Sequence, residues 1–333
     1  MEQTIEKEIV HSNVISENCE ENGENIQWFE ESLQADLKWS LAINSVLYKG
    51  TTKFQDVALL DTKHFGKVLV IDGKMQSAEN DEFIYHESLI HPALLLHDNP
   101  KTVFIMGGGE GSAAREALKH YSIEKVVMSD IDQEVVNICR KHLTANQEAF
   151  ADSRLYVIIN DTKVELEKSE WKYDVIVGDL SDPREGGPCN HLYFKSFYEC
   201  VIKPKLNYNG IFVTQAGFAG ILSHKGLFSS IYNTTKQVFK YVIAYTAHVP
   251  SFADTRGWVL ASDQPFKLDA EVLESRIKER INGELQYLDA AFMLSRTVMN
   301  KTVDTSLQNE TNILTEENEK FLFEHGLLAA DSV

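Results

Sequence analysis

The segment from Lys101 to Leu118 constrains the fold of this chain more than any other. Residues 101–112 have the sequence KTVFIMGGGEGS, in which an apolar, β-forming run ends in glycines, and the helix-forming run AAREAL follows directly. Glycines permit a tight turn and allow the backbone to approach a ligand, because they lack a Cβ atom. This order of strand, turn and helix is typical of nucleoside-binding α/β folds, although an ordinary tight loop would also contain glycines.

Two acidic residues give this turn a more specific interpretation. Asp130 ends the next expected strand, about twenty residues further on, where this fold places an acceptor for ribose hydroxyls. Glu110 lies within the turn itself. A carboxylate at that point would repel a pyrophosphate, because like charges repel. The sequence therefore favours a nucleoside with a positively charged part over a dinucleotide.

The composition limits the partners and the compartment. The chain has 333 residues and a net charge of -18, from 32 basic and 50 acidic residues. Nucleic acid and anionic membranes are poor partners for such a surface and a polycation is a better one, although many acidic enzymes have no cationic ligand. Four cysteines without metal-binding spacing predict free thiols in a reducing compartment; they are Cys19, Cys139, Cys189 and Cys200. The chain start does not resemble a signal peptide and no run is apolar enough to span a bilayer, so we expect a cytoplasmic protein.

Turn and periodicity signals divide the chain into four parts. We expect a disordered acidic tail at 1–25, a small antiparallel β domain at 26–80, a Rossmann-like catalytic domain at 81–300, and a polar tail at 301–333 with a helical signal near Glu317–His325. The large domain alternates strands with helices, which predicts a doubly wound, mainly parallel α/β sheet of seven strands that ends in a hairpin. The expected strands are 45–48, 54–60 and 67–71 in the small domain, and 102–106, 125–129, 154–159, 173–178, 209–214, 240–247 and 256–261 in the large one. The expected helices are 81–96 with Asp81 as a cap, 111–119, 133–143, 162–168, 195–202, 223–237 and 269–281.

Acidic side chains gather at the carboxyl ends of the expected strands, where this fold binds its ligands. Those that follow the strands are Glu110, Asp130, Asp161, Asp179 and Asp182, and Gln215 follows the fifth strand. Any one of them could be a helix cap or a turn residue, as Asp161 before a helical stretch illustrates. Crowded carboxylates repel one another unless a cation or a proton relieves them, so the whole set favours a cationic ligand. No histidine or cysteine cluster suggests zinc, and without a basic phosphate-binding loop there is little for magnesium to bridge.

Three residues of another type are expected at the same edge. Tyr85 and His86 lie on the helix that leads into the large sheet, and Trp39 lies upstream. Neighbours on a helix point about 100 degrees apart, so one of the pair can pack while the other reaches a ligand. The alternative is that Trp39 and Tyr85 belong to an interdomain core and that His86 is a buried histidine with its hydrogen bonds satisfied.

Three motifs carry a resemblance to a known family. Residues 69–87 (LVIDGKMQSAENDEFIYHE), 107–111 (GGGEG) and 178–183 (GDLSDP) resemble the spermidine/spermine synthase family of aminopropyltransferases, and the match runs in order from about Trp28 to about Glu284. The resemblance implies a methyltransferase-type Rossmann-like fold and transfer of an aminopropyl group from decarboxylated S-adenosylmethionine to a polyamine, with methylthioadenosine released. It implies no cofactor and a homodimer or homotetramer. Further details resemble the plant branch of this family that makes thermospermine; these are GGGEGSAARE at 107–116, GGPC at 186–189 and FVTQAG at 212–217.

The resemblance also assigns roles to single residues. Asp179 matches the family's proton acceptor. Donor-binding positions are matched by Gln55, Gly107, Gly109, Glu110, Asp130, Ile131, Asp161, Thr162, Leu180 and Pro188. Positions that line the amine channel are matched by Trp39, Tyr85, His86, Asp182, Gln215 and Phe252. Glu110, where most spermidine synthases have Asp, would hold the donor's ammonium; Asp130, usually Glu, would bind the ribose hydroxyls; and Asp161 with Thr162 would meet the adenine amino group.

Two departures from the family pattern concern the acceptor. Phe252 stands where spermidine synthases usually have Tyr, so a hydroxyl contact is missing, and His86 replaces a Gln found in some relatives. We expect spermidine as the acceptor and thermospermine as the product, with the regiochemistry resting on the resemblance alone. The alternatives within the family are a spermine synthase and a spermidine synthase.

Two functions outside this family remain open. An S-adenosylmethionine-dependent methyltransferase would share the doubly wound sheet, but Glu110 argues against it because that donor carries a carboxylate next to its ammonium. A non-catalytic polyamine-binding protein would need the acidic site but not Asp179, so the presence of Asp179 favours an enzyme.

Overall fold

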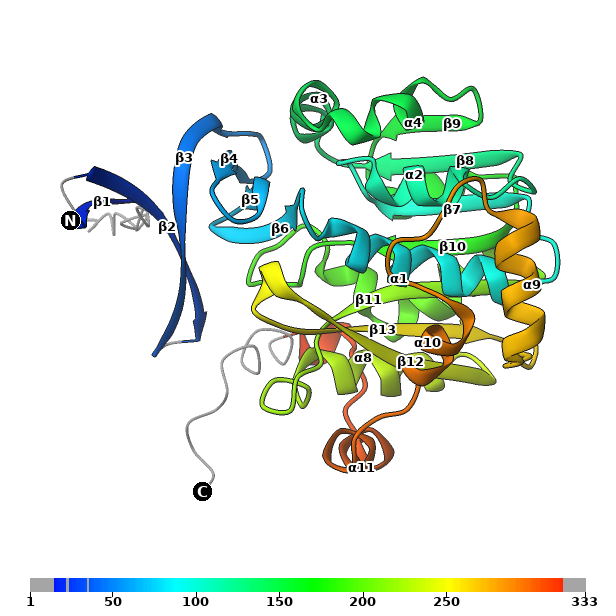
Figure 1. Cartoon of the computed structure of the whole chain (residues 1–333). Coiled ribbons are helices and arrows are strands. Elements are labelled where there is room, and N and C mark those ends of the chain that lie inside the picture. The colour runs from blue at the N-terminus through cyan, green and yellow to red at the C-terminus, as the bar shows by residue number, and fades with distance from the viewer. Residues whose placement is uncertain (1–14, 22–23, 35, 320–333) are drawn as a thin grey trace, which may run out of the picture.

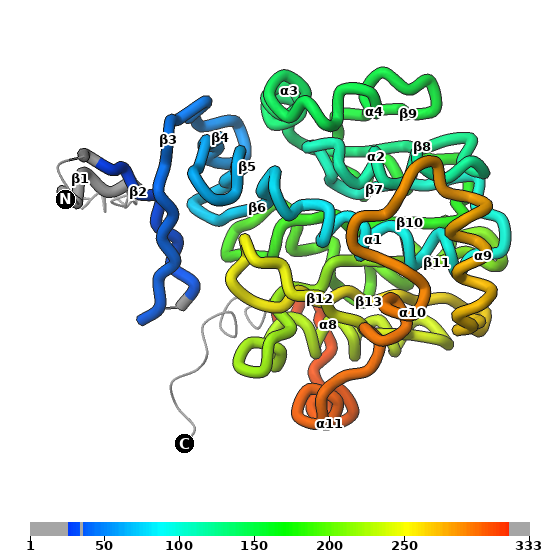
Figure 2. The backbone as a smooth tube through the Cα atoms, in the orientation of Figure 1, coloured from blue at the N-terminus to red at the C-terminus, as the bar shows by residue number. Residues whose placement is uncertain are grey.

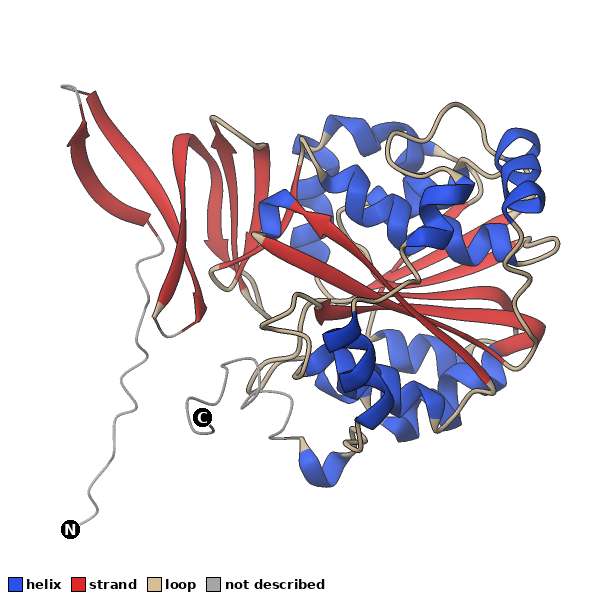
Figure 3. Cartoon of the chain, turned by 60° about the horizontal axis from the view of Figure 1, so that its bottom comes forward, coloured by secondary structure: helices blue, strands red, loops and turns tan. Residues whose placement is uncertain are grey.

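The computed structural model describes residues 15–21, 24–34 and 36–319 of the chain. In this part of the chain, a small antiparallel sheet precedes a seven-stranded sheet that carries helices on both faces (Figures 1 and 3). The backbone trace in Figure 2 places the small sheet at one side of the molecule, with its last strand leading into the larger domain. The fold class expected from the sequence is confirmed.

The small sheet has six strands in the described residues, each antiparallel to the next. They are β1 (Ile15–Glu21), β2 (Glu24–Gln34), β3 (Leu37–Thr51), β4 (Asp56–Thr62), β5 (Gly66–Ile71) and β6 (Lys74–Ala78). A cluster of apolar side chains that includes Phe29 and Val68 is buried on the sheet. The expected runs at 45–48, 54–60 and 67–71 correspond to β3, β4 and β5, whereas β6 has no counterpart among them.

Strand β1 corrects the expectation for the start of the chain. The disorder expected at 1–25 is wrong for residues 15–21, because the backbone of this segment pairs with β2, with Ile15 opposite Phe29. Such a ladder uses backbone N–H and C=O groups, so an acidic sequence without apolar periodicity can still extend the edge of a sheet. Residues 1–14 lie outside the described residues.

Helix α1 (Glu82–Leu96) connects the two sheets. Asp81 precedes it in the position of a cap, but its side chain does not cap the helix. Instead, Asp81 Oδ2 accepts a hydrogen bond from Ser251 N, at 2.7 Å, in the 3-10 turn η4 (Pro250–Phe252). This bond fixes the first turn of α1 beside the end of the large sheet.

The large sheet has the strand order β12-β13-β11-β10-β7-β8-β9 in the described residues. Its strands are β7 (Thr102–Gly107), β8 (Lys125–Asp130), β9 (Leu155–Ile159), β10 (Tyr173–Asp179), β11 (Leu206–Phe218), β12 (Tyr241–Val249) and β13 (Asp254–Ser262). Neighbours from β9 to β11 are parallel, whereas β13 runs antiparallel to β11 and forms a hairpin with β12. All seven expected strands and the terminal hairpin are confirmed.

Helices form a layer on each face of this sheet (Figure 3). After α1 they are α2 (Ser112–Leu118), α3 (Gln133–His142), α4 (Gln147–Ala151), α5 (Thr162–Lys168), α6 (Lys195–Phe197), α7 (Lys203–Lys205), α8 (Leu227–Lys236), α9 (Ala270–Arg280), α10 (Ala290–Ser295) and α11 (Lys301–Asn309). Shorter helical turns besides η4 are η1 (Thr144–Asn146), η2 (Asn190–Tyr193), η3 (Tyr198–Ile202) and η5 (Glu316–Asn318). Val103 and Ile105 of β7 pack with α1 and α2, whereas Phe104 and Met106 pack with the layer that contains α8 and α11. The apolar run of β7 is therefore buried on both faces, as is typical of a central parallel strand.

Helix α3 joins the small domain to the large one. Its residues Val135, Ile138 and Cys139 form a buried cluster with Val57 and Leu59 of β4. Because α3 directly follows the loop after β8, this cluster brings the small domain close to the carboxyl ends of the parallel strands.

The segment after residue 300 packs on the large domain. Val303 and Leu307 of α11 are buried in the same core as α8. The expected polar tail at 301–333 is therefore corrected for 301–319, because two apolar residues four apart give α11 a packing face. The helical signal at Glu317–His325 overlaps η5 and otherwise lies outside the described residues. In the described part of the chain, no helix combines the length and the apolar character that crossing a membrane requires.

Candidate active site

The glycine turn after β7 lies against the end of β10. Gly107 and Gly108 have φ values of 74° and 75°, a left-handed backbone that favours glycine. Gly108 N donates a hydrogen bond to Asp179 O at 3.2 Å, and a Cβ atom on Gly107 would collide with the same carbonyl oxygen. Leu180 Cδ2 would lie 3.4 Å from that Cβ position. The turn therefore fixes the backbone that carries Asp179.

Asp130, at the end of β8, is held by the same turn. Its Oδ2 accepts a hydrogen bond from Gly109 N and its Oδ1 accepts one from Asp132 N, both at 2.9 Å. A Cβ atom on Gly109 would lie 2.6 Å from Asp130 Oδ2, so this approach requires glycine. Removal from water raises the pKa of Asp130, and the half-buried Ile131 follows it. Gly109, Asp130 and Ile131 thus lie together, as a nucleoside site requires.

Gln55 reaches this region from the small domain. Its Nε2 donates a hydrogen bond to Asp132 Oδ2 at 3.1 Å, and Thr52 Oγ1 donates to the same oxygen at 2.6 Å. Asp132 Oδ1 also caps α3 by accepting a hydrogen bond from Glu134 N at 3.0 Å. Asp132 therefore connects the small domain to the loop that carries Asp130.

Asp161 has the helix-capping role that the sequence left open. Its Oδ1 accepts hydrogen bonds from Lys163 N at 2.8 Å and Val164 N at 3.3 Å, at the start of α5. Its other oxygen lies 3.9 Å from His191 Nε2. The neighbouring Thr162 is buried, and its Oγ1 has no hydrogen-bond partner among the described residues. Capping leaves Asp161 Oδ2 and Thr162 Oγ1 free to meet a ligand.

Asp179 and Tyr85 form the centre of the site. Tyr85 OH donates a hydrogen bond to Asp179 Oδ1 at 3.2 Å. Removal from water raises the pKa of Asp179 to about 6; the charge of His86 lowers it and that of Glu110 raises it. Burial raises the pKa of Tyr85, which keeps this hydroxyl a donor. A carboxylate with a pKa near neutral pH can accept a proton and release it again, as general-base catalysis requires.

His86 lies between two carboxylates. Its Nδ1 is 2.7 Å from Glu82 Oε2 and its Nε2 is 3.3 Å from Glu110 Oε1. Burial alone would lower its pKa, but Glu110 and Glu82 raise it to about 9, so His86 is an imidazolium at neutral pH. Tyr85 and His86 therefore both reach the site, one through Asp179 and the other through Glu110.

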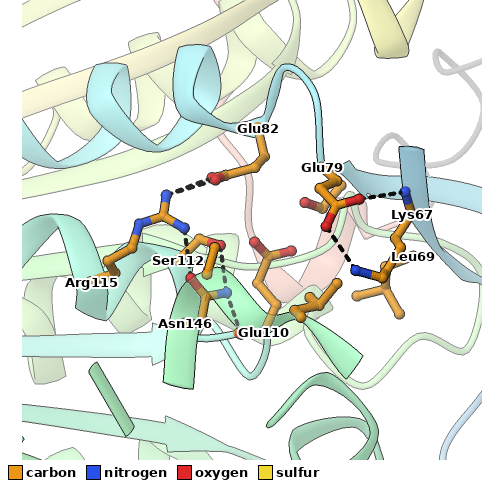
Figure 4. Close-up of a pocket in the computed structure, with 11 residues that line it drawn as sticks. Lys67, Leu69, Glu79, Glu82, Glu110, Ser112, Arg115 and Asn146 are labelled. Atoms are coloured by element: carbon orange, nitrogen blue, oxygen red, sulfur yellow. Dashed lines mark hydrogen bonds and ion pairs between the residues drawn. The ribbon is translucent and has the colours of Figure 1, made fainter. Parts of the chain in front are cut away.

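Glu110 points into a pocket between the small domain and α1. Figure 4 shows its carboxylate between Glu82 of α1 and Glu79, which follows β6. Asn146 Nδ2 holds the turn by donating to Glu110 O and to Ser112 Oγ, both at 2.9 Å. Glu110 Oε1 is buried and accepts no hydrogen bond among the described residues, although it forms an ion pair with His86 Nε2 at 3.3 Å. This oxygen can receive a cationic group of a ligand.

Asp182 and Gln215 form a polar network with Arg256, a residue that the sequence analysis missed. Arg256 donates two hydrogen bonds to the carboxylate of Asp182, at 2.9 and 2.8 Å, and one to Gln215 Oε1 at 2.8 Å. Gln215 Nε2 also donates to Leu180 O at 2.9 Å. The Phe252 ring lies 5.9 Å from that of Tyr85, which places the network beside the centre of the site.

Two of the expected site residues, Trp39 and Pro188, have surroundings of another kind. The Trp39 ring packs 6.5 Å from Phe65 against the cluster of the small sheet, rather than in the interdomain core that the sequence left open. Pro188 is half-buried in the loop between β10 and η2. Neither residue forms a side-chain hydrogen bond or a ring contact with Tyr85 or Asp179 among the described residues.

One group of side chains has the arrangement of metal ligands. Glu82, His86 and Glu110 each offer one ligand atom, and these atoms lie within 4.8 Å of one another; no second group of this kind occurs in the part of the chain that the structure describes. Arg115 NH2 donates to both oxygens of Glu82, at 2.7 and 2.9 Å. The arrangement is an ion-pair network in which His86 and Arg115 already supply positive charge, which argues against a metal ion among these three residues.

Sequence signals exist for some of the residues that were missed. Glu82 was missed although it lies four residues before the expected site residue His86 on a helix, and such residues lie on the same face. Arg256 interrupts the apolar strand β13, where a charged side chain needs a buried partner. Asp132 precedes a helical run as a capping residue does. Nothing comparable identifies Asp182 as the partner of Arg256.

These features define a class of α/β protein in which a glycine turn at the carboxyl edge of the sheet faces buried carboxylates in place of a phosphate site. Comparison with known proteins gives the family. Residues 82–269 match the spermine/spermidine synthase domain, and residues 27–79 match the spermidine synthase tetramerisation domain. The chain belongs to the spermine/spermidine synthase family.

Individual relatives agree with this assignment. The chain is 65% identical to thermospermine synthase ACAULIS5 of Arabidopsis thaliana over 306 residues, which cover 92% of this chain and 90% of that protein. It is 42% identical to a polyamine aminopropyltransferase of Aeropyrum pernix over 302 residues, which cover 89% and 95%. A crystal structure of spermidine synthase in complex with the transition state analogue AdoDATO has a TM-score of 0.78 at 27% identity, over 85% of this chain and 95% of that one. The resemblance noted in the motifs is confirmed.

Proposed function

We propose that this enzyme transfers the aminopropyl group of decarboxylated S-adenosylmethionine to spermidine and produces thermospermine and methylthioadenosine. The observation that carries the proposal is the 65% identity to a thermospermine synthase over 92% of the chain. The site is consistent with it, because Asp179 lies between Tyr85 and the network of Glu110 and His86.

Asp179 is the proposed proton acceptor. The attacking amine is an ammonium in water, with a pKa of about 10, and it must lose a proton before its lone pair can attack. A nitrogen–carbon bond to the aminopropyl group then forms while the carbon–sulfur bond breaks, and the bonding electrons stay on sulfur. The leaving group is a neutral thioether, so it needs no acid. Tyr85 would orient Asp179 through its 3.2 Å hydrogen bond.

The proposed donor contacts rest on the resemblance to the family. Glu110 Oε1 would bind the primary ammonium of the donor, and Asp130 would bind the ribose hydroxyls. Asp161 Oδ2 and Thr162 Oγ1 would meet the adenine amino group. Gln55 would close the donor site from the small domain.

Product analysis tests the proposal directly. We expect incubation with decarboxylated S-adenosylmethionine to convert spermidine well and putrescine poorly, with thermospermine as the main product. Thermospermine requires attack by the aminopropyl end of spermidine and spermine requires the aminobutyl end, a difference worth at most about 1–3 kcal/mol. Chromatography of derivatised polyamines separates the two isomers. Spermine as the main product would overturn the regiochemistry, and preferential conversion of putrescine would overturn the acceptor.

The methyltransferase alternative has its own test. A carboxylate on the donor would lie near Glu110 and repel it, so we expect the decarboxylated donor to bind more tightly than S-adenosylmethionine. Isothermal titration with both compounds measures the difference. Tight binding of S-adenosylmethionine alone would favour the methyltransferase.

The donor contacts predict separate effects for two variants. Asp130→Ala should weaken the donor and methylthioadenosine alike, because both contain the ribose, by about 1.5–3 kcal/mol for a hydrogen bond to a charged group. Glu110→Gln should weaken the donor but spare methylthioadenosine, which lacks the ammonium. Calorimetry measures both ligands, and unchanged methylthioadenosine affinity in Asp130→Ala would refute the ribose contact.

The pKa of Asp179 predicts the pH dependence. We expect kcat/KM to fall as the pH falls through about 6, because Asp179 must be ionised to accept a proton. The charge of His86 lowers the pKa of Asp179 and that of Glu110 raises it. The acid limb of the pH profile, where kcat/KM falls, should therefore move to higher pH in His86→Gln and to lower pH in Glu110→Gln. Initial rates between about pH 5 and 8 show both shifts. An acid limb that both variants leave in place would contradict the assignment.

The same proposal includes the assembly and the location. We propose a homodimer or homotetramer, which the match of residues 27–79 to a tetramerisation domain supports. We also propose that the protein needs no cofactor and works in the cytoplasm, where its free thiols Cys139, Cys189 and Cys200 would stay reduced.

A further inference from the structure

Arg256 is a buried cation next to a site that we propose to bind cations. It lies on β13 opposite Phe218 of β11 and is 4% exposed. Its guanidinium forms a bidentate pair with Asp182, at 2.9 and 2.8 Å, and donates to Gln215 Oε1 at 2.8 Å. Bidentate pairs of this kind are among the strongest hydrogen-bonded ion pairs in proteins.

Aromatic rings hold the guanidinium on both sides. Its central carbon lies 4.7 Å from the centre of the Phe218 ring and 4.9 Å from that of Phe252. The Phe252 ring is in turn 5.9 Å from that of Tyr85, whose hydroxyl binds Asp179. One aromatic ring therefore separates the charge of Arg256 from the side chain that orients the proposed proton acceptor.

Asp182 is the first acidic residue after Asp179 in the same loop, and its side chain is 36% exposed. It is the natural partner for the second nitrogen of an amine whose first nitrogen lies at Asp179. Burial raises the pKa of Asp182, but Arg256 more than offsets this and the pKa is lowered. Asp182 is thus ionised, yet Arg256 already compensates its charge. An incoming ammonium must compete with the guanidinium for the same two oxygens.

A further buried carboxylate approaches this loop from the small domain. Glu31 of β2 is 7% exposed, and its Oε2 accepts a hydrogen bond from Met75 N at 2.9 Å. Its Oε1 lies 3.6 Å from Nζ of Lys74, a half-exposed lysine that an ammonium at Glu31 would have to displace. Met75 lies on β6, which contacts η4 and hence the turn of Phe252. Arg184, in the loop of Asp182, forms an ion pair with Asp72 of the small domain at 2.6 Å. Burial raises the pKa of Glu31, and the charge of Asp182 adds to the rise, which agrees with their proximity.

We propose that Arg256 is a specificity-determining residue: it is a resident cation that occupies the second-ammonium position at Asp182 and thereby selects triamines over diamines. A diamine has its first nitrogen at Asp179, and its only other nitrogen meets this compensated site at Asp182. A triamine has a third nitrogen, which can bind the carboxylate of Glu31. This inference rests on the proposed function, because it assigns the acceptor preference of the same site.

The test compares neutral variants of Arg256 with the wild-type enzyme. The Met side chain of Arg256→Met keeps the apolar stem between the rings, and the Gln side chain of Arg256→Gln keeps a hydrogen-bond donor for Asp182. Either variant should raise the ratio of kcat/KM for putrescine to that for spermidine by about ten- to hundredfold, the effect of one charge-assisted hydrogen bond. Arg256→Lys keeps the charge and should give a ratio between the wild-type and neutral values.

Two controls make the result specific. Arg296 stacks 4.4 Å from the centre of the Phe292 ring, near α10, so Arg296→Met also removes an arginine from a phenylalanine and should leave the ratio unchanged. Glu31→Gln should lower kcat/KM for spermidine but not for putrescine. Thermal melts and methylthioadenosine binding show that each variant is folded.

The outcomes separate this inference from the proposed function. Absence of aminopropyl transfer by the wild-type enzyme refutes the proposed function. Transfer by the wild-type enzyme with an unchanged ratio in a folded neutral variant overturns the assignment of Arg256 alone. An equal loss for both acceptors in Glu31→Gln overturns the binding of the third nitrogen there. If only one of the two neutral variants folds, that variant decides the result.

Discussion

Asp179→Asn is expected to lower kcat by about 100- to 10,000-fold, the usual contribution of a positioned general base. Asparagine has nearly the same shape as aspartate and can accept the 3.2 Å hydrogen bond from Tyr85 through its amide oxygen. It cannot take up a proton from an ammonium. The change therefore removes the proton acceptor while keeping the packing around it.

Turnover and ligand binding must be measured separately in this variant. Methylthioadenosine affinity should stay close to the wild-type value, because the proposed nucleoside contacts involve Asp130 and Asp161 and do not involve Asp179. Asp304→Asn, on the outer helix α11, makes the same chemical change far from the site and should leave kcat unchanged. A kcat of Asp179→Asn within about threefold of wild type would show that another group accepts the proton.

The second large effect is expected on stability and concerns Arg115. Its Nε lies 3.0 Å from Glu116 Oε1, and its NH2 lies 2.7 Å from Glu82 Oε1. Glu82 also pairs with His86, and Glu116 pairs with His91 at 2.9 Å. A continuous chain of ion pairs thus runs from the active site into the packing between α1 and α2. Within this chain, Arg115 is the link between Glu82 and Glu116.

The sequence predicts the core strands because several signals agree there. The run that forms β7 is apolar throughout, and the structure buries Val103 and Phe104 on opposite faces of the sheet. Asp130 and Asp179 were placed correctly at the ends of strands, because the alternation of strands and helices determines which residues reach the carboxyl edge. Strand β1 was not predictable from apolar pattern, since it is joined to the sheet by backbone pairing with β2.

The charge states in the site depend on pairs that no local pattern identifies. Arg256 and Asp182 are 74 residues apart and meet only because β13 lies next to β11 and β11 lies next to β10. The imidazolium of His86 requires Glu110 from another element in addition to Glu82 from its own helix. Two of the five carboxylates therefore have a cationic partner that the sequence analysis did not assign: His86 lies beside Glu110, and Arg256 lies beside Asp182.

Two candidate site residues, Asp161 and Trp39, show that the sequence does not decide whether a residue faces the site. Asp161 caps α5 with one oxygen and keeps the other free, so the structural and the ligand-binding interpretations are compatible. Trp39 packs within the small sheet. A sequence alone lists the residues that can serve a site, and only the fold decides which of them face it.

Arg115→Met is therefore expected to destabilise the protein by about 3–5 kcal/mol, the usual cost of removing one partner from a buried ion pair. The methionine fills much of the same volume, so packing changes little. The loss comes from Glu82 and Glu116, whose side chains are only 13% and 1% exposed. Glu82 would keep His86 as a partner and Glu116 would keep His91 and Lys119, so both would hold their charge with less compensation. Both carboxylates have a lowered pKa despite their burial, which shows how strongly their partners stabilise the charged form.

Urea unfolding measures this loss as a shift in midpoint at constant m value. Lys278→Met is the matched control, because it removes a cation from the exposed pair with Glu274 on α9 and should change the unfolding free energy by less than about 1 kcal/mol. Equal effects of the two variants would mean that the pairs of Arg115 contribute no more than a surface pair. A large loss in Arg115→Met alone would show that the ion-pair chain holds α1 on α2. The position of His86 beside Glu110 would then depend on a residue that is linked to His86 only through Glu82.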